Sequence, residues 1–199
     1  MSRPRPIARL KITLADVEPK VVRRIDVPLG IRLDRLHQVL QAAMPWTDSH
    51  LYEFTAGGTG WGMPDPDGLY GGPLPAPKST LKDVLEDTGA KTIHYIYDYG
   101  DHWDHVIKVE RIGEADPMLL YPFLIAATGR CPPEDIGGST GYAELLEAIA
   151  DPDHEEHESM LRWAGGNFDP EAAPVQEIDA ALERLAKRWA PKPRKPKPS

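Results

Sequence analysis

Cysteine is nearly absent from this chain of 199 residues, since Cys131 is the single one. One cysteine excludes an intramolecular disulfide, and it also excludes a zinc site built from several thiolates. Long hydrophobic runs are absent too: no apolar stretch approaches the roughly 18 residues of a membrane span, and the N-terminus lacks the apolar core of a signal peptide. These absences predict a cytoplasmic protein without a membrane segment.

Positive charge is scarce over most of the chain. The sequence carries 23 lysines and arginines against 31 aspartates and glutamates, for a formal net charge of -8. Residues 187–199 hold six of these bases and no acid, so the rest of the chain has 17 bases against 31 acids. Such a body repels nucleic-acid phosphates unless a local basic patch overrides the repulsion. We therefore expect a protein or small-molecule partner and no nucleic acid, except through the basic tail, whose other interpretation is a solubilising disordered end.

Hydrophobic periodicity predicts the secondary structure. Alternating apolar residues predict strands at 7–16, 20–28, 50–56, 92–99 and 103–110. Apolar residues at helical spacing predict helices at 32–44, 80–87, 140–150, 153–164 and 175–189. Residues 57–77, with seven glycines and five prolines, predict a long loop, and residues 117–138 predict an irregular segment. Because the strands precede most helices, the predicted class is α+β, an antiparallel sheet with helices packed on it and a helical C-terminal part.

The chain length suits one domain. We expect a single domain over residues 1–189, followed by a tail at 190–199 whose prolines and lysines predict an extended, disordered segment.

The stretch Tyr97-Asp-Tyr-Gly-Asp-His-Trp-Asp-His105 concentrates acids, imidazoles and aromatic rings around one turn. Gly100-Asp101 is a two-residue turn signal, which sets Asp98 opposite Trp103. Directly opposed residues share a face, so this register makes Asp98 and His105 diagonal neighbours on one face.

A carboxylate beside an imidazole has three uses. It orients a general base, it supplies ligands to zinc or another divalent metal, or it forms a buried hydrogen-bonded pair that fixes the hairpin. Asp101 and His102 at the turn are further candidates for binding a ligand. The loop Cys131-Pro-Pro-Glu-Asp-Ile-Gly-Gly138 adds two carboxylates, Glu134 and Asp135, which complete a metal or acid/base site or cap backbone amides.

Several segments together resemble the plasmid pRiA4b ORF-3-like protein family, whose members include passenger proteins of insertion elements. The resemblance rests on Val21–Pro28, Leu36–Gln41 with Trp46, His50–Phe54, the hairpin Tyr97–His105, Cys131–Gly138 with Gly141-Tyr142, and Trp163 ahead of Phe168-Asp-Pro170. It runs from about residue 7 to 185 and implies an α+β fold. A family cysteine is replaced by Ile136 here and a family histidine by Tyr52, which argues against a cysteine-assisted metal or redox role.

Two functions follow from these residues. The first is a non-enzymatic binding or regulatory domain associated with mobile elements. The alternative is a metal-dependent hydrolase or nuclease, in which Asp98, His105 and Glu134 hold a divalent metal and Glu134 or Asp135 activates water. A DNA recombinase is disfavoured, because no serine of the body lies among arginines and the body is acidic.

Overall fold

The computed structural model describes residues 6–63 and 72–190. Within them the strands are β1 (Pro6–Leu14), β2 (Val22–Pro28), β3 (Tyr52–Ala56), β4 (Thr59–Gly62), β5 (Leu74–Pro75), β6 (Thr92–Tyr97), β7 (Trp103–Glu114) and β8 (Phe123–Thr128). The helices are α1 (Leu33–Ala43), α2 (Leu81–Thr88), α3 (Gly138–Ala150), α4 (His157–Trp163) and α5 (Val175–Trp189), with a 3-10 turn at Ala76–Lys78. The α+β class is confirmed.

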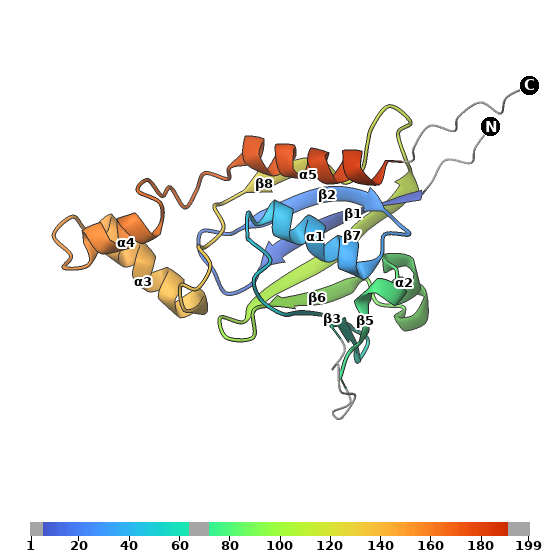
Figure 1. The fold of residues 1–199 in the computed structure, drawn as a ribbon, viewed down its shortest axis with the longest axis horizontal. Helices are drawn as coiled ribbons and strands as arrows, with labels where there is room; N and C mark the ends of the chain where they lie inside the picture. The colour runs from blue at the N-terminus through green and yellow to red at the C-terminus, as the bar shows by residue number, and fades with distance from the viewer. Residues whose placement is uncertain (1–5, 64–71, 191–199) are drawn as a thin grey trace, which may run out of the picture.

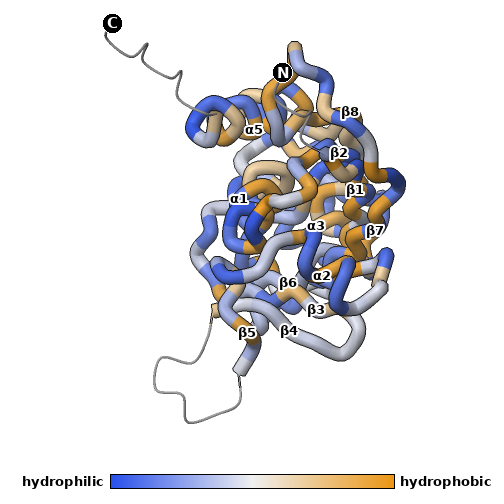
Figure 2. The backbone as a smooth tube through the Cα atoms, turned by 90° about the vertical axis from the view of Figure 1, so that its right-hand side faces the viewer, coloured by the Kyte–Doolittle hydropathy of each residue, from blue (hydrophilic) through white to orange (hydrophobic). Residues whose placement is uncertain are grey.

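The strands of the described chain form one sheet in the order β5-β4-β3-β6-β7-β1-β2-β8. Neighbouring strands pair antiparallel except for the short β4–β5 pair, which is parallel. Helices α1, α2 and α5 lie on one face of the sheet, and α3 and α4 extend beyond one end of it (Figure 1). In the orthogonal view, α1 and α5 lie on one side of the strands β1, β2 and β7 (Figure 2).

Alternation along the strands explains this one-sided arrangement. In β1 the side chains of Leu10, Ile12 and Leu14 are fully buried, while Lys11 and Thr13 between them are partly exposed. The apolar set packs under α1, whose Leu36 and Leu40 are also fully buried. An antiparallel sheet with one covered face therefore builds the core, and its polar face meets solvent.

A buried arginine ties the end of α1 to the sheet. Arg23 is fully buried, and its Nε donates a 2.8 Å hydrogen bond to the carbonyl of Ala43, the last residue of α1. Its Nη1 donates to the carbonyl of Thr128 at 2.7 Å. The cation thus meets the negative end of the helix dipole, which offsets the cost of burying its charge.

Most predicted elements are found, with three differences. The capping box at Thr80 and Asp83 opens α2 as predicted. The segment predicted as a long loop contains β4 and β5, although residues 64–71 lie outside the described part. The segment predicted to be irregular contains β8, and α4 is shorter than predicted. The predicted disorder of the tail concerns residues 191–199, which also lie outside the described part.

The predicted register of the β6–β7 hairpin is wrong by one residue. Tyr97 pairs with Trp103 and Tyr95 with His105, so the loop spans residues 98–102. Left-handed backbone at Asp98 (φ 58°) and His102 (φ 56°) makes this longer loop, and the amide of His102 donates to the carbonyl of Asp98 at 2.6 Å. His105 therefore faces the core, while Asp98 lies in the loop.

Candidate metal centre

Three loops meet at one end of the sheet: residues 45–51, residues 98–102 and residues 131–138. The indole Nε1 of Trp46 donates to the carbonyl of Pro132 at 3.0 Å, which joins the first loop to the third. The amide of Asp98 donates to the carbonyl of Leu51 at 2.9 Å, which joins the second loop to the first. The amide of Gly137 donates to the carboxylate of Asp101 at 3.2 Å. Each loop is thus anchored to another.

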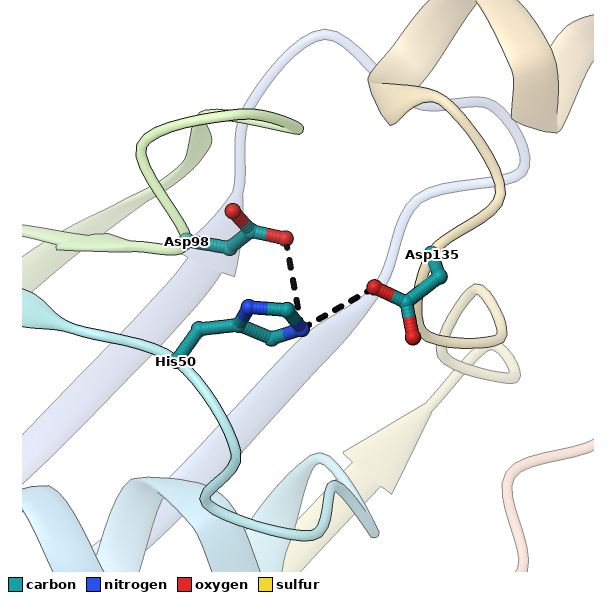
Figure 3. Close-up of side chains that lie close together, drawn as sticks. All are labelled: His50, Asp98 and Asp135. Atoms are coloured by element: carbon teal, nitrogen blue, oxygen red, sulfur yellow. Dashed lines mark ion pairs between the residues drawn. The ribbon is translucent and has the colours of Figure 1, made fainter.

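One ligand group comes from each loop: His50, Asp98 and Asp135 (Figure 3). The Nε2 atom of His50 lies 3.0 Å from Oδ1 of Asp135 and 3.6 Å from Oδ2 of Asp98. One ligand atom from each residue lies within 4.8 Å of the other two. Across the described residues, this is the group of three His, Cys, Asp or Glu side chains close enough to share an ion.

The two separations measured from Nε2 of His50, 3.0 and 3.6 Å, are close to those of ligands that share a metal ion. Two ligand atoms that each lie about 2.1 Å from an ion are separated by roughly 3.0 Å at a right angle and roughly 3.4 Å at a tetrahedral angle. The Nε2 atom of His50 is buried and makes no directed hydrogen bond, although Asp135 lies within hydrogen-bonding distance. In Figure 3 the ring nitrogen faces the gap between the two carboxylates. An ion in that gap would bond to the nitrogen, which faces both carboxylates without a directed hydrogen bond in the described structure.

The backbone places both carboxylates in an unusual conformation. Asp98 and Asp135 both have φ of 58°, a left-handed region that residues with side chains adopt at a cost. In Asp98 the Oδ1 atom accepts a 2.8 Å hydrogen bond from the amide of Gly100, while Oδ2 faces His50. The local turn therefore fixes the carboxylate and leaves one oxygen for a ligand.

Glu134 braces the site rather than completing it. Its Oε1 accepts a 2.6 Å hydrogen bond from the Tyr97 hydroxyl, and its Oε2 accepts from the hydroxyl and amide of Thr47 at 2.6 and 3.0 Å. The Ser49 hydroxyl donates to Oε1 at 3.3 Å. Burial favours the neutral acid, but the hydrogen bonds from Thr47, Tyr97 and Ser49 outweigh it and lower the pKa of Glu134. The carboxylate is ionised, and its acceptor sites are occupied.

His105 lies in the core beneath these loops. Its side chain is fully buried, and its Nδ1 donates to the carbonyls of Tyr95 (3.1 Å) and Trp103 (3.0 Å). The Trp46 ring stands edge-on to it at 5.3 Å between centroids. Burial lowers the pKa of His105 to about 4, so the ring is neutral near pH 7. His105 is therefore buried and hydrogen-bonded to main-chain carbonyls, but the pair that the sequence suggested between His105 and Asp98 is not among the hydrogen bonds of the described residues.

The structure brings together only part of the residue set predicted from the sequence. Asp98 and Asp135 converge, whereas the predicted combination of Asp98, His105 and Glu134 is not among the close groups of the described residues. Asp101 holds the amide of Gly137, and His102 is exposed at the turn. Sequence reasoning missed His50 as a ligand. Its signal was a histidine at the start of the strand predicted at 50–56, but only the pairing of Tyr52 with Tyr97 sets it beside Asp98.

A cavity of about 290 Å³ lies along the same loop that carries Asp135. Its walls include Trp46, Pro132, Glu134, Trp163 and Phe168. Cys131 also lines it, and burial raises the pKa of that thiol well above its usual value. The thiol is therefore protonated near pH 7 and lacks the thiolate that nucleophilic or metal chemistry requires.

Comparisons with known proteins agree with this fold. The model of the family described as plasmid pRiA4b ORF-3-like protein matches residues 6–177. The chain is 50% identical over 195 residues to "Uncharacterized protein y4hQ" of Sinorhizobium fredii, covering 95% of this chain and 97% of that protein. The crystal structure of "Protein of Unknown Function MM3350" from Methanosarcina mazei Go1 superposes with a TM-score of 0.76 at 34% identity, covering 84% of this chain and 94% of that one. The chain belongs to the plasmid pRiA4b ORF-3-like protein family.

Proposed function

We propose that this protein is a divalent-metal-binding domain whose ion is held by His50, Asp98 and Asp135. The observation that carries the proposal is the convergence of three ligand atoms from three separately anchored loops, with a buried ring nitrogen that faces both carboxylates and makes no directed hydrogen bond within the described residues. One imidazole and two carboxylates suit Zn²⁺ or a related transition ion better than Mg²⁺, which prefers an all-oxygen shell.

Binding rather than catalysis is the role that the surrounding groups support. Three protein ligands leave at least one coordination position for water or an anionic ligand, as in hydrolytic zinc sites. A hydrolase also needs a free base to activate that water, and neither carboxylate next to the three ligands is free. Glu134 is engaged by Thr47, Ser49 and Tyr97, and Asp101 is engaged by Gly137. The open position therefore serves to hold a ligand, in keeping with a non-enzymatic binding or regulatory domain.

A metal-dependent hydrolase or nuclease is the second candidate, and exposure of Asp135 and His102 favours it. His102 lies in the same turn as Asp98, and its ring makes no hydrogen bond in the described structure. In a hydrolase, His102 would act as the base. The family description names a plasmid. This supports the proposal that the protein, as a binding domain or as a hydrolase, is associated with a mobile element.

The test of metal binding uses protein purified without a histidine tag. Elemental analysis and calorimetric titration with Zn²⁺ are expected to give one equivalent, and His50→Ala is expected to abolish it. His94→Ala is the matched control, because His94 also contacts a carboxylate, Asp104 at 3.1 Å, but only that one. Loss of zinc from both variants, or from neither, would sink the proposal.

Stability gives a second measurement. An ion present at 100 times its dissociation constant stabilises the folded state by about 2.7 kcal/mol. Thermal unfolding of the wild type is expected to shift upward with Zn²⁺ and back with a chelator, while Asp135→Asn shows a smaller shift. If the hydrolase alternative is right, His102→Gln abolishes zinc-dependent hydrolysis while zinc affinity is unchanged. Hydrolysis that survives this substitution removes His102 as the base.

A further inference from the structure

A row of positive charges crosses the face of the sheet opposite the helices. Lys11 lies between the buried Leu10 and Ile12 on β1, so its side chain is directed away from the core. Its cross-strand partners are Arg24 on β2 and Lys108 on β7. Directly opposed residues share a face, so three cations stand side by side on adjacent strands about 4.8 Å apart.

A second row widens this surface. On the same face, two residues along β1, Arg9 pairs with Arg111 of β7. We call the five side chains of the two rows the basic patch: Arg9, Lys11, Arg24, Lys108 and Arg111. The basic patch could not be recognised from the sequence. Its five residues come from three strands, and the net charge of the chain is negative.

Acids neutralise only part of the basic patch. Arg9 forms a double hydrogen bond with Asp26, both at 2.8 Å, and Arg24 lies 3.1 Å from Glu110. Within residues 6–63 and 72–190, Lys11, Lys108 and Arg111 take part in none of the ion pairs. The patch therefore carries three uncompensated positive charges on a chain whose net charge is -8.

This arrangement costs stability. Like charges directly opposite each other on neighbouring strands destabilise a sheet. Lys11 is opposed by a cation on each side. A face that met only solvent would gain stability from a neutral residue at Lys11, Lys108 or Arg111, whose charges no acid of the described residues compensates. Binding of an anionic partner would offset the repulsion between these neighbouring cations and accounts for their presence on this face.

We infer that the basic patch binds the phosphodiester backbone of a nucleic acid, without reading the bases. The patch belongs to the face of the sheet opposite α1 and α5, and no helix of the described residues lies over it (Figure 2). Its five members are cations, so the patch itself offers neither an aromatic ring on which a base could stack nor an apolar anchor of the kind that dominates protein interfaces; Tyr121 lies close enough to Arg9 to affect its pKa but is not a member of the patch. Electrostatic attraction is therefore the interaction that the patch offers to a partner. A nucleic acid carries one negative charge per nucleotide, so it can contact several of these cations at once. This site is separate from the metal centre and does not depend on it.

The test compares two double variants of the full chain by fluorescence anisotropy. The probes are a labelled dT20 strand and a labelled duplex of the same length. Lys11→Gln with Lys108→Gln removes two patch charges, whereas Lys82→Gln with Lys187→Gln removes two charges from α2 and α5 on the other face. Circular dichroism verifies that each variant is folded.

Salt dependence gives the expected size of the effect. Three phosphate contacts give a slope of roughly -2 in the logarithm of affinity against the logarithm of salt for a single strand, with a steeper slope for duplex. The patch variant is expected to lose more than half of this slope and at least about tenfold in affinity at low salt. The α2/α5 variant is expected to bind like the wild type.

Three results overturn the inference. Equal losses in both double variants show that net charge alone is responsible. Displacement of the nucleic acid by poly-glutamate at equal charge concentration shows that the face accepts any polyanion, acidic proteins included. Binding that survives in the patch variant but vanishes when Lys192, Arg194, Lys195 and Lys197 are replaced by glutamine assigns it to the C-terminal segment.

Discussion

Acidification is expected to destabilise the protein through His105. This side chain is fully buried and its pKa is lowered to about 4, against 6.5 for an ordinary histidine. The unfolded chain takes up a proton as the pH falls through 6.5, whereas the folded chain excludes it until about pH 4. The stability that His105 contributes as a neutral group is therefore complete above pH 6.5 and is lost as the pH falls from 6.5 to 4.

The lowered pKa sets the size of this loss. A shift of one pKa unit corresponds to 1.36 kcal/mol, so the difference between 6.5 and about 4 corresponds to about 3 kcal/mol. That is a large fraction of the total stability of an ordinary domain. The loss accrues at about 1.4 kcal/mol per pH unit inside the window, and this group adds nothing further below pH 4.

Urea unfolding of the wild type and of His105→Asn, followed between pH 4 and pH 7.5 with a chelator present, measures this term. Asparagine keeps a donor near Nδ1 for the carbonyls of Tyr95 and Trp103, and it does not titrate. Carboxylates elsewhere titrate in both proteins and cancel in the comparison. The wild type is expected to lose about 3 kcal/mol more than the variant on acidification. A difference between the two proteins that stays constant with pH would refute the reasoning.

Three further predictions concern the loops around the metal centre. Gly138→Ala is expected to lower the free energy of unfolding by roughly 1–3 kcal/mol, because φ there is 68° and the added methyl would lie 2.6 Å from the carbonyl of Asp101; Gly30→Ala, with nothing within 4 Å, is the control, and equal effects contradict the explanation. Glu134→Gln is expected to cost about 1 kcal/mol in urea unfolding, since several donors lose a charged acceptor; an unchanged midpoint shows that the brace is dispensable. Cys131 is expected to resist Ellman's reagent in the folded protein and to react fully in urea, and fast reaction without denaturant contradicts its protonated, buried state.

Local pattern predicted the elements that carry a strong period. The alternation in β1 and β2 and the apolar stripe of α1 each place one face against the core, so each could be found without knowing its neighbours. β8 was missed because its exposed Ile125 and Ala126 interrupt the alternation. Its place is set by pairing with β2, which is a long-range contact.

The proposed metal centre depends on two facts that a single sequence does not contain. The first is the left-handed backbone at Asp98 and His102, which lengthens the hairpin loop and turns His105 inward; the turn signal at Gly100-Asp101 pointed to the shorter alternative. The second is the pairing of β3 with β6, which brings His50 beside Asp98 across almost fifty residues of chain. The sequence motifs identified two of the loops that form the site. Which of their side chains lie together depends on strand pairing in the folded protein.

The loop from Cys131 to Gly138 contributes residues to two neighbouring sites. Asp135 lies beside His50 in the proposed metal centre, and Pro132 and Glu134 border the cavity. Binding at the two sites is then linked by thermodynamic reciprocity. If a molecule in the cavity shifts this loop and changes the affinity for the ion by some factor, the ion changes the affinity for that molecule by the same factor. A screen for cavity ligands can accordingly be read out as a change in zinc affinity, without knowing in advance what the cavity holds.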